Sequence, residues 1–303
     1  MLVAAYPDSV SSKRFGRDGL TPLLAAVRRH AAPQTINALL VANPEQAFVA
    51  TRAKTNLPLH EAIEQNAPVK VIKLILNTNP EAAVLPNRFH HTPLHLAIKS
   101  MSSIDVFKLL LEIAPQVARK TYSRVKSPLE MAAEEFIKAP TVTHASELVG
   151  PSGASWERFL LILRAAYMDL MGSKKDGDMN VDPSREWHVL HAAVSFNVPK
   201  KLLQTILLLY PHQISQVDSL GRTPLSIAAD SGMEWENGLR TLFDAFPDAI
   251  WETDASTGLH VFMSAAKRKQ NRLHSKPLSQ LNTVYELLLA GPVMRYDAIC
   301  YAS

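Results

Sequence analysis

A short apolar pattern returns along the chain at a nearly constant interval. A large apolar residue stands three positions before an alanine seven times, and successive copies begin 36, 35, 35, 61, 35 and 37 residues apart. The interval of 61 equals one period plus an insertion of about 26 residues. Such a repeat constrains the fold strongly, because each unit must bury its apolar face against its neighbours. The copies are Leu23–Ala26, Leu59–Ala62, Leu94–Ala97, Leu129–Ala132, Leu190–Ala193, Leu225–Ala228 and Phe262–Ala265.

Prolines follow a second apolar pattern with the same period. Each has apolar residues at positions −5 and −4, and six of the seven also have one at −8, which is the spacing of one helix face. Each repeat is therefore predicted to hold a short first helix, a longer second helix that ends at the proline, and a loop, here called the finger, leading into the next first helix. The prolines are Pro7, Pro44, Pro80, Pro115, Pro211, Pro247 and Pro292.

The first helices carry a recognisable motif. Thr92–Ala97 (TPLHLA) resembles the signature of ankyrin repeats, Leu57–Ala62 and Thr223–Ala228 are close variants, and Asp218–Arg222 is similar to the finger that precedes that signature. The chain departs from the family where Pro-x-x-Ala/Ile replaces the usual Gly-Ala after the second helix. The resemblance implies an all-α fold, an α-solenoid of about seven stacked helix–turn–helix repeats. It also implies that His60, His95 and His191 bind backbone groups of the fingers.

We expect a single ankyrin-like repeat domain over residues 1–303. Residues 1–10 match the end of a second helix, which predicts that the natural protein extends upstream or that a partner covers this edge. The fourth repeat is predicted to hold insertion loops at residues 138–155 and 172–186, on either side of a second helix at about Trp156–Met171. Residues 267–277 are predicted to form a basic loop.

The sequence gives little support for catalysis. No phosphate-binding glycine motif and no nucleophile elbow occurs. The histidine pairs His91/His95 and His188/His191 have helical spacing but no third ligand nearby. A single cysteine, Cys300, excludes an intramolecular disulfide framework and favours an intracellular setting, the cytoplasm with the nucleus as the alternative. We therefore predict a protein that is no enzyme and has no catalytic residue, cofactor or metal.

Charge is distributed unevenly. Residues 1–137 carry 16 Lys and Arg against 11 Asp and Glu, whereas the rest of the chain is close to neutral. Many of these cations fall in the predicted fingers, which favours a partner-binding edge that attracts an acidic protein. Solvated loops that are simply charged are the alternative. The candidate partner-binding residues are Arg52, Lys54, Arg88, Arg124 and Lys126.

The leading functional hypothesis is a non-catalytic scaffold that binds a protein partner through fingers and first helices. The alternative is a nuclear or nucleic-acid-associated regulatory factor that uses the basic run Lys267–Lys276. The net charge of only +4 weighs against nucleic acid as the partner. A third reading is the adaptor part of a longer enzyme or channel. The apolar runs are too short to insert into a membrane, and the sequence leaves the oligomeric state open.

Overall fold

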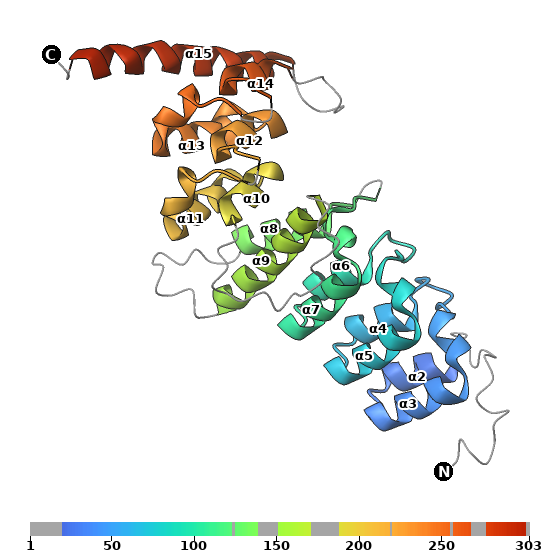
Figure 1. Cartoon of the computed structure of the whole chain (residues 1–303). Coiled ribbons are helices and arrows are strands. Elements are labelled where there is room, and N and C mark those ends of the chain that lie inside the picture. The colour runs from blue at the N-terminus through green and yellow to red at the C-terminus, as the bar shows by residue number, and fades with distance from the viewer. Residues whose placement is uncertain are drawn as a thin grey trace. The chain divides into compact units, whose positions relative to one another are not determined.

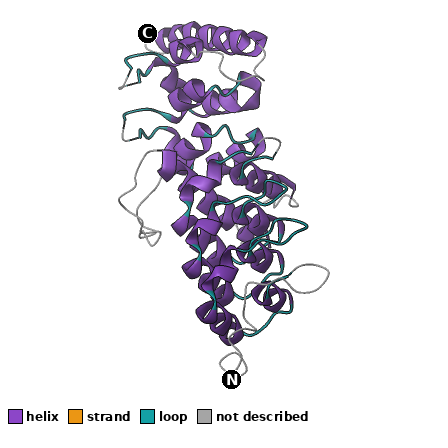
Figure 2. Cartoon of the chain, turned by 90° about the vertical axis from the view of Figure 1, so that its right-hand side faces the viewer, coloured by secondary structure: helices purple, strands orange, loops and turns teal. Residues whose placement is uncertain are grey.

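The computed structural model describes residues 20–122, 125–138, 151–170, 188–218, 220–254, 257–267 and 277–300. Contacts within the chain group it into two compact units, Met1–Val181 and Asp182–Ser303, which are described separately below. Among the described residues, helices are the only regular elements, apart from isolated β-bridges in two fingers (Figures 1 and 2). The fold is the expected all-α solenoid. The prediction of one domain over residues 1–303 stays a prediction.

The first unit stacks helix pairs in two layers (Figure 1). Each first helix contacts the next first helix, and each second helix contacts the next second helix. The first helices are α2 (Pro22–Arg28), α4 (Pro58–Glu64), α6 (Pro93–Lys99) and α8 (Pro128–Lys138), and the second helices are α3 (Pro33–Ala42), α5 (Val69–Thr78), α7 (Ile104–Ile113) and α9 (Pro151–Leu170).

Local sequence explains where the first helices begin. Thr21 accepts a hydrogen bond from the Leu24 N–H and thereby caps α2, while Pro22 occupies the first helical position, where no N–H is needed. The repeated motif then buries its apolar residues, as in α6, where Leu94 is 2% and Ala97 0% exposed. The small alanine lets the neighbouring helices approach closely.

The prolines after the second helices differ from expectation. They begin short 3-10 helices rather than loops, at η2 (Pro44–Phe48), η3 (Pro80–Ala83) and η4 (Pro115–Arg119). The fixed φ of proline is compatible with a 3-10 helix as well as with a helix end. The exit segment then packs back onto the stack: Gln46 of η2 accepts a hydrogen bond from the Leu23 N–H at 2.8 Å.

The fourth repeat follows the prediction in part. Its second helix α9 begins at Pro151, so residues 151–155 are helical and the predicted insertion loop 138–155 is wrong there, because proline is well suited to open a helix. Trp156 and Phe159 of α9 are buried; Trp156 packs beside Phe136, and Phe159 packs beside Trp156. The predicted loop at residues 172–186, residues 139–150 and residues 1–10 lie outside the described part of the chain.

The second unit repeats the arrangement. Its first helices α10, α12 and α14 contact one another in chain order. Gly238 bends the chain in η7 at φ 148°, and a Cβ there would lie 2.9 Å from both Leu203 and Met233. The elements are α10 (Val189–Ser195), α11 (Lys200–Leu209), η6 (Pro211–Ile214), α12 (Pro224–Ser231), η7 (Trp235–Leu239), α13 (Arg240–Ala245), η8 (Pro247–Trp251), α14 (Val261–Lys267) and α15 (Pro277–Cys300).

The last helix corrects one expectation. Helix α15 continues past Pro292, where the sequence pattern predicted its end. In earlier repeats the segment after the proline packs on a first helix, as η8 does on α12 and α14. The structure describes no first helix packed on the segment after Pro292.

Candidate functional site

The fingers of both units are tight turns closed by a backbone hydrogen bond. In the Asn87 finger (Asn87–His91) the N–H of Asn87 donates to the carbonyl of His91 at 2.9 Å, and in the Asp218 finger (Asp218–Arg222) the equivalent bond measures 3.0 Å. The side chain of the first residue closes the turn a second time. The Asn87 amide oxygen accepts from the N–H groups of Phe89 and His91, each at 3.0 Å.

Two of the three buried histidines, His95 and His191, connect the first helices to the following fingers, as the family resemblance implied, whereas Nδ1 of His60 accepts from the Leu57 N–H within its own repeat. Nδ1 of His95 accepts from the Thr92 N–H at 3.1 Å, and Nε2 lies 2.9 Å from the carbonyl of Lys126 in the next finger. His191 makes the equivalent contact with Arg222 at 3.2 Å. Burial lowers the pKa of His60, His95 and His191 to about 4, so all three are neutral at pH 7. Their role is structural.

A polar network joins the first three repeats. The buried carboxylate of Glu61 lies 2.6 Å from Nε of Arg28 on α2 and 3.3 Å from the amide of Asn56. The Asn56 amide also donates to Glu64 at 2.8 Å, and its oxygen accepts from the Asn87 amide at 2.9 Å. A further backbone bond, from the Arg88 N–H to the Lys54 carbonyl at 3.0 Å, joins the two fingers directly. The Thr51–Asn56 and Asn87 fingers are thus joined to each other by side-chain and backbone hydrogen bonds.

The structure divides the candidate partner-binding cations into two kinds. Lys54 pairs with Glu64 at 2.5 Å, and Lys126 pairs with Glu134 of α8. Arg52 and Arg88 are exposed and have no carboxylate partner among the described residues, although Arg88 donates to the Ala53 carbonyl. Arg124 lies outside the described residues. Fewer of the described candidate cations therefore lack a carboxylate partner than the finger sequences suggested.

One position at the end of the first helices distinguishes the third repeat. Glu64, Lys99 and Glu134 are spaced by 35 residues and occupy equivalent places in α4, α6 and α8. The two glutamates neutralise Lys54 and Lys126, whereas Lys99 is a cation whose described polar partner is Nε2 of His91 at 3.3 Å. Lys99 is not among the residues predicted from the sequence. Aligning the repeats column by column rather than searching the fingers would have revealed it.

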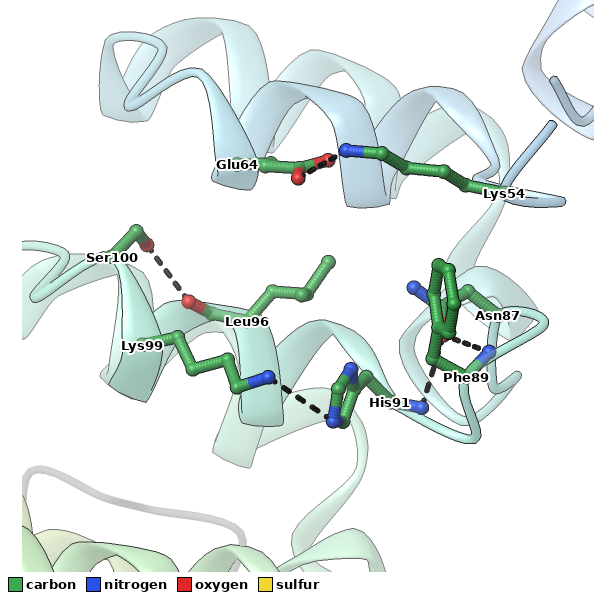
Figure 3. A pocket seen from close by; sticks show the side chains of 8 residues that line it. All are labelled: Lys54, Glu64, Asn87, Phe89, His91, Leu96, Lys99 and Ser100. Atoms are coloured by element: carbon green, nitrogen blue, oxygen red, sulfur yellow. Dashed lines mark hydrogen bonds and ion pairs between the residues drawn. The ribbon is translucent and has the colours of Figure 1, made fainter. Parts of the chain in front are cut away.

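A pocket of about 460 Å³ lies where Lys99 replaces the glutamate of the neighbouring repeats (Figure 3). Two first helices and two fingers contribute to it. The Lys54–Glu64 pair lies on one side, Leu96 and Lys99 of α6 on the other, and the Asn87 finger between them at one end (Figure 3). The lining residues are Lys54, Glu64, Asn87, Phe89, His91, Leu96, Lys99 and Ser100.

The described residues contain no group of three or more His, Cys, Asp or Glu side chains placed to hold a metal ion. The pairs considered in the sequence are ring contacts: the centroids of His91 and His95 are 5.8 Å apart, and those of His188 and His191 are 4.8 Å apart. No helix within the described part of the chain is long and apolar enough to cross a bilayer. Of the basic run Lys267–Lys276, the structure describes only Lys267.

Stacked helix pairs joined by fingers define the class of helical repeat proteins, in which recognition surfaces extend along the stack. Residues 23–121 match the family model for ankyrin repeats, in three copies. Residues 23–121 thus carry ankyrin repeats, and such repeats are generally protein–protein interaction modules. No curated protein shows significant sequence similarity to the chain.

Solved ankyrin repeat domains are similar in structure. That of Bcl-3, described as a unique member of the IkappaB protein family, is 18% identical, with 81% of this chain and 90% of that one covered and a TM-score of 0.46. The domain of human ASB11 is also 18% identical, with 89% and 97% covered and a TM-score of 0.38.

Proposed function

We propose that this chain is a non-catalytic interaction scaffold that binds a protein partner through the finger surface of its first unit. We define this surface as helices α4, α6 and α8 with the fingers Thr51–Asn56 and Asn87–His91 and the described residues Tyr122, Val125 and Lys126 of the following finger. The single observation that carries the proposal is the pocket of about 460 Å³ in this surface, which two first helices and two fingers line together. The intracellular setting expected from the lone cysteine is part of the proposal.

Rigidity and charge support this surface. The network from Arg28 to Asn87 holds successive fingers in place before a partner arrives, which reduces the entropy lost on binding. Arg52 and Arg88 extend into solvent at its edge without a carboxylate partner among the described residues. Exposed cations at a rim mainly raise the association rate and make it depend on salt. These features favour an acidic partner.

The test is affinity capture from a cell lysate with charge-reversed chains. Arg52→Glu combined with Arg88→Glu changes two cations that hold no ion pair among the described residues, so the fold should persist. Adding Lys54→Glu, Arg124→Glu and Lys126→Glu tests the full candidate set. The matched control is Lys73→Glu with Lys108→Glu, because these exposed lysines lie on the second helices α5 and α7.

We expect the finger variants to lose the main captured protein while their helical circular dichroism stays unchanged. The control should retain that protein. Equal capture by the wild-type chain and all finger variants would move the partner surface elsewhere and overturn the proposal.

A further inference from the structure

The third repeat breaks a charge pattern that its neighbours keep. In the second and fourth repeats, a glutamate at the end of the first helix neutralises a finger lysine. In the third repeat that position is Lys99, and the finger presents Phe89 and His91 to the pocket instead (Figure 3). The nearest carboxylate in the lining, Glu64, is already bound to Lys54 and Asn56. The pocket therefore holds a cation without a counter-ion among the described residues.

The contact with His91 does not supply the missing charge. Burial, and then the positive charge of Lys99, lower the pKa of His91, so its imidazole is neutral and can only accept one of the N–H groups of Lys99. An ammonium group has three donors, and the Lys99 side chain is exposed. The Lys99 ammonium therefore keeps N–H donors and its positive charge, and both can bind an incoming anion.

Apolar surface lies beside this cation. The Phe89 side chain is 52% exposed although it is a large aromatic group, and Leu96 forms part of the same lining. Aromatic side chains held on rigid turns are common anchors in protein interfaces, because they bury a large area at low entropic cost. An exposed Phe89 in the same pocket as an ammonium without a counter-ion among the described residues matches a ligand that is apolar at one end and anionic at the other.

We infer that this pocket binds an acidic peptide segment of the protein partner, with an Asp or Glu carboxylate at the Lys99 ammonium and a neighbouring apolar side chain against Phe89 and Leu96. The inference rests on the proposed function and specifies the partner. The neutral Lys54–Glu64 side of the pocket offers no free charge, so the carboxylate lies on the α6 side, at Lys99. The partner is a protein, since a single ammonium flanked by apolar groups suits one carboxylate better than a run of phosphates.

The experiment selects peptides from a displayed library of random 16-residue sequences against the full chain. Three baits are compared: the wild type, Lys99→Glu, and the control Lys108→Glu on the second helix of the same repeat. One enriched peptide is then labelled, and its affinity for each bait is measured by fluorescence polarisation. Phe89→Ala is the second variant, since it tests the apolar anchor without changing charge.

We expect the wild type and Lys108→Glu to enrich peptides in which Asp or Glu lies within a few residues of Leu, Ile, Phe or Trp. The Lys99→Glu chain should instead enrich Lys or Arg at that place, and it should bind the labelled acidic peptide about 10- to 100-fold more weakly, as expected for a lost charge-assisted contact. Phe89→Ala should weaken the binding of the same peptide.

Two results would overturn the inference. One is the selection of peptides without an acidic residue, and the other is binding that Lys99→Glu leaves unchanged. Neither contradicts the scaffold itself, which fails only when the finger variants capture the same proteins as the wild type. A failure of the pocket and a failure of the proposed function are therefore distinguishable.

Discussion

The Asn87 finger of the first unit and the Asp218 finger of the second adopt the same turn with different chemistry. In each, a side-chain oxygen of the first residue accepts two backbone N–H groups, from Phe89 and His91 or from Leu220 and Arg222. Asp218 also binds the Arg222 guanidinium through its second oxygen, at 2.8 and 3.0 Å. Asn87 carries no charge, and its amide reaches back to Asn56 in the preceding finger.

The difference shows that one turn can serve two purposes. The Asp218 finger neutralises its own arginine and is complete within one repeat. The Asn87 finger binds its neighbour and leaves Arg88 without a carboxylate partner among the described residues. Of these two fingers, the Asn87 finger has positive charge available for a partner, and it lines the pocket.

Acid should have the largest effect, and it should act more strongly on the first unit. The imidazoles of His60 and His95 in the first unit and His191 in the second have a pKa of about 4 when folded, against an ordinary 6.5. The unfolded chain therefore binds more protons, and stability falls as the pH drops from 6.5 to 4, by on the order of 3 kcal/mol for each histidine. Hydrogen exchange across this range should show amides of α4 and α6 losing protection more steeply than those of α10.

The control for this effect is His95→Gln, which removes one titrating group. Its free energy of unfolding should depend less steeply on pH between 6.5 and 4. Asp218 should respond only at lower pH. Burial raises the pKa of its carboxyl, but the hydrogen bonds and charge of Arg222 outweigh burial and hold it below the ordinary value, so its contribution is lost as the pH falls below 3.8. Stability that is flat down to pH 4 would contradict the account.

Removing the turn-closing side chain should have the next largest effect. Asp218→Ala leaves two backbone N–H groups and a mostly buried guanidinium without their acceptor, which should cost about 3 kcal/mol in urea unfolding. Asn87→Ala removes uncharged contacts only and should cost about 2 kcal/mol. Asp218→Asn, which keeps the turn but not the charge, should cost less unfolding free energy than Asp218→Ala. Equal losses for Asp218→Asn and Asp218→Ala would show that the turn contributes nothing.

Backbone conformation should produce a smaller difference. Gly221 has φ 72°, and His90 occupies the equivalent place in the Asn87 finger with φ 61°. Gly221→Ala should therefore cost about 1 kcal/mol, because a Cβ is disfavoured in this left-handed region. His90→Gly should gain less than that, since it also loses the ring contact with Tyr122 at 6.4 Å. Thermal unfolding measures both, and a stabilising Gly221→Ala would contradict the comparison.

The exposed ion pair beside the pocket should contribute least. Lys54 and Glu64 are 43% and 32% exposed, so Glu64→Gln should change stability by less than about 1 kcal/mol. The same substitution removes the negative charge nearest the pocket and should raise affinity for an acidic peptide. Lower affinity would show that Glu64 itself contacts the ligand.

Much of the fold could be predicted because its signals are local and repeated. The motif Thr92–Ala97 contains its own cap and helix, and period alone places the remaining copies. The segments after the second helices were predicted less well, since a proline such as Pro44 can either end an α-helix or begin a 3-10 helix. The resemblance also anticipated the role of the histidines.

The candidate site could be predicted only in part. Charge in the fingers is visible in the sequence, but which cations are neutralised depends on contacts such as Lys126 with Glu134, made after folding. Lys99 is an ordinary helix-end lysine until its neighbours are seen in the second and fourth repeats. Phe89 likewise becomes significant only once it is found exposed beside Lys99.

The most direct test of the central claim is hydrogen exchange of the full chain with and without the protein that it captures from a lysate. The account predicts new protection of amides in residues 85–100, which hold the Asn87 finger and α6. The Asp218 finger and the second helices α5 and α7 should be unchanged. Protection confined to the Asp218 finger, or to α5 and α7, would contradict it.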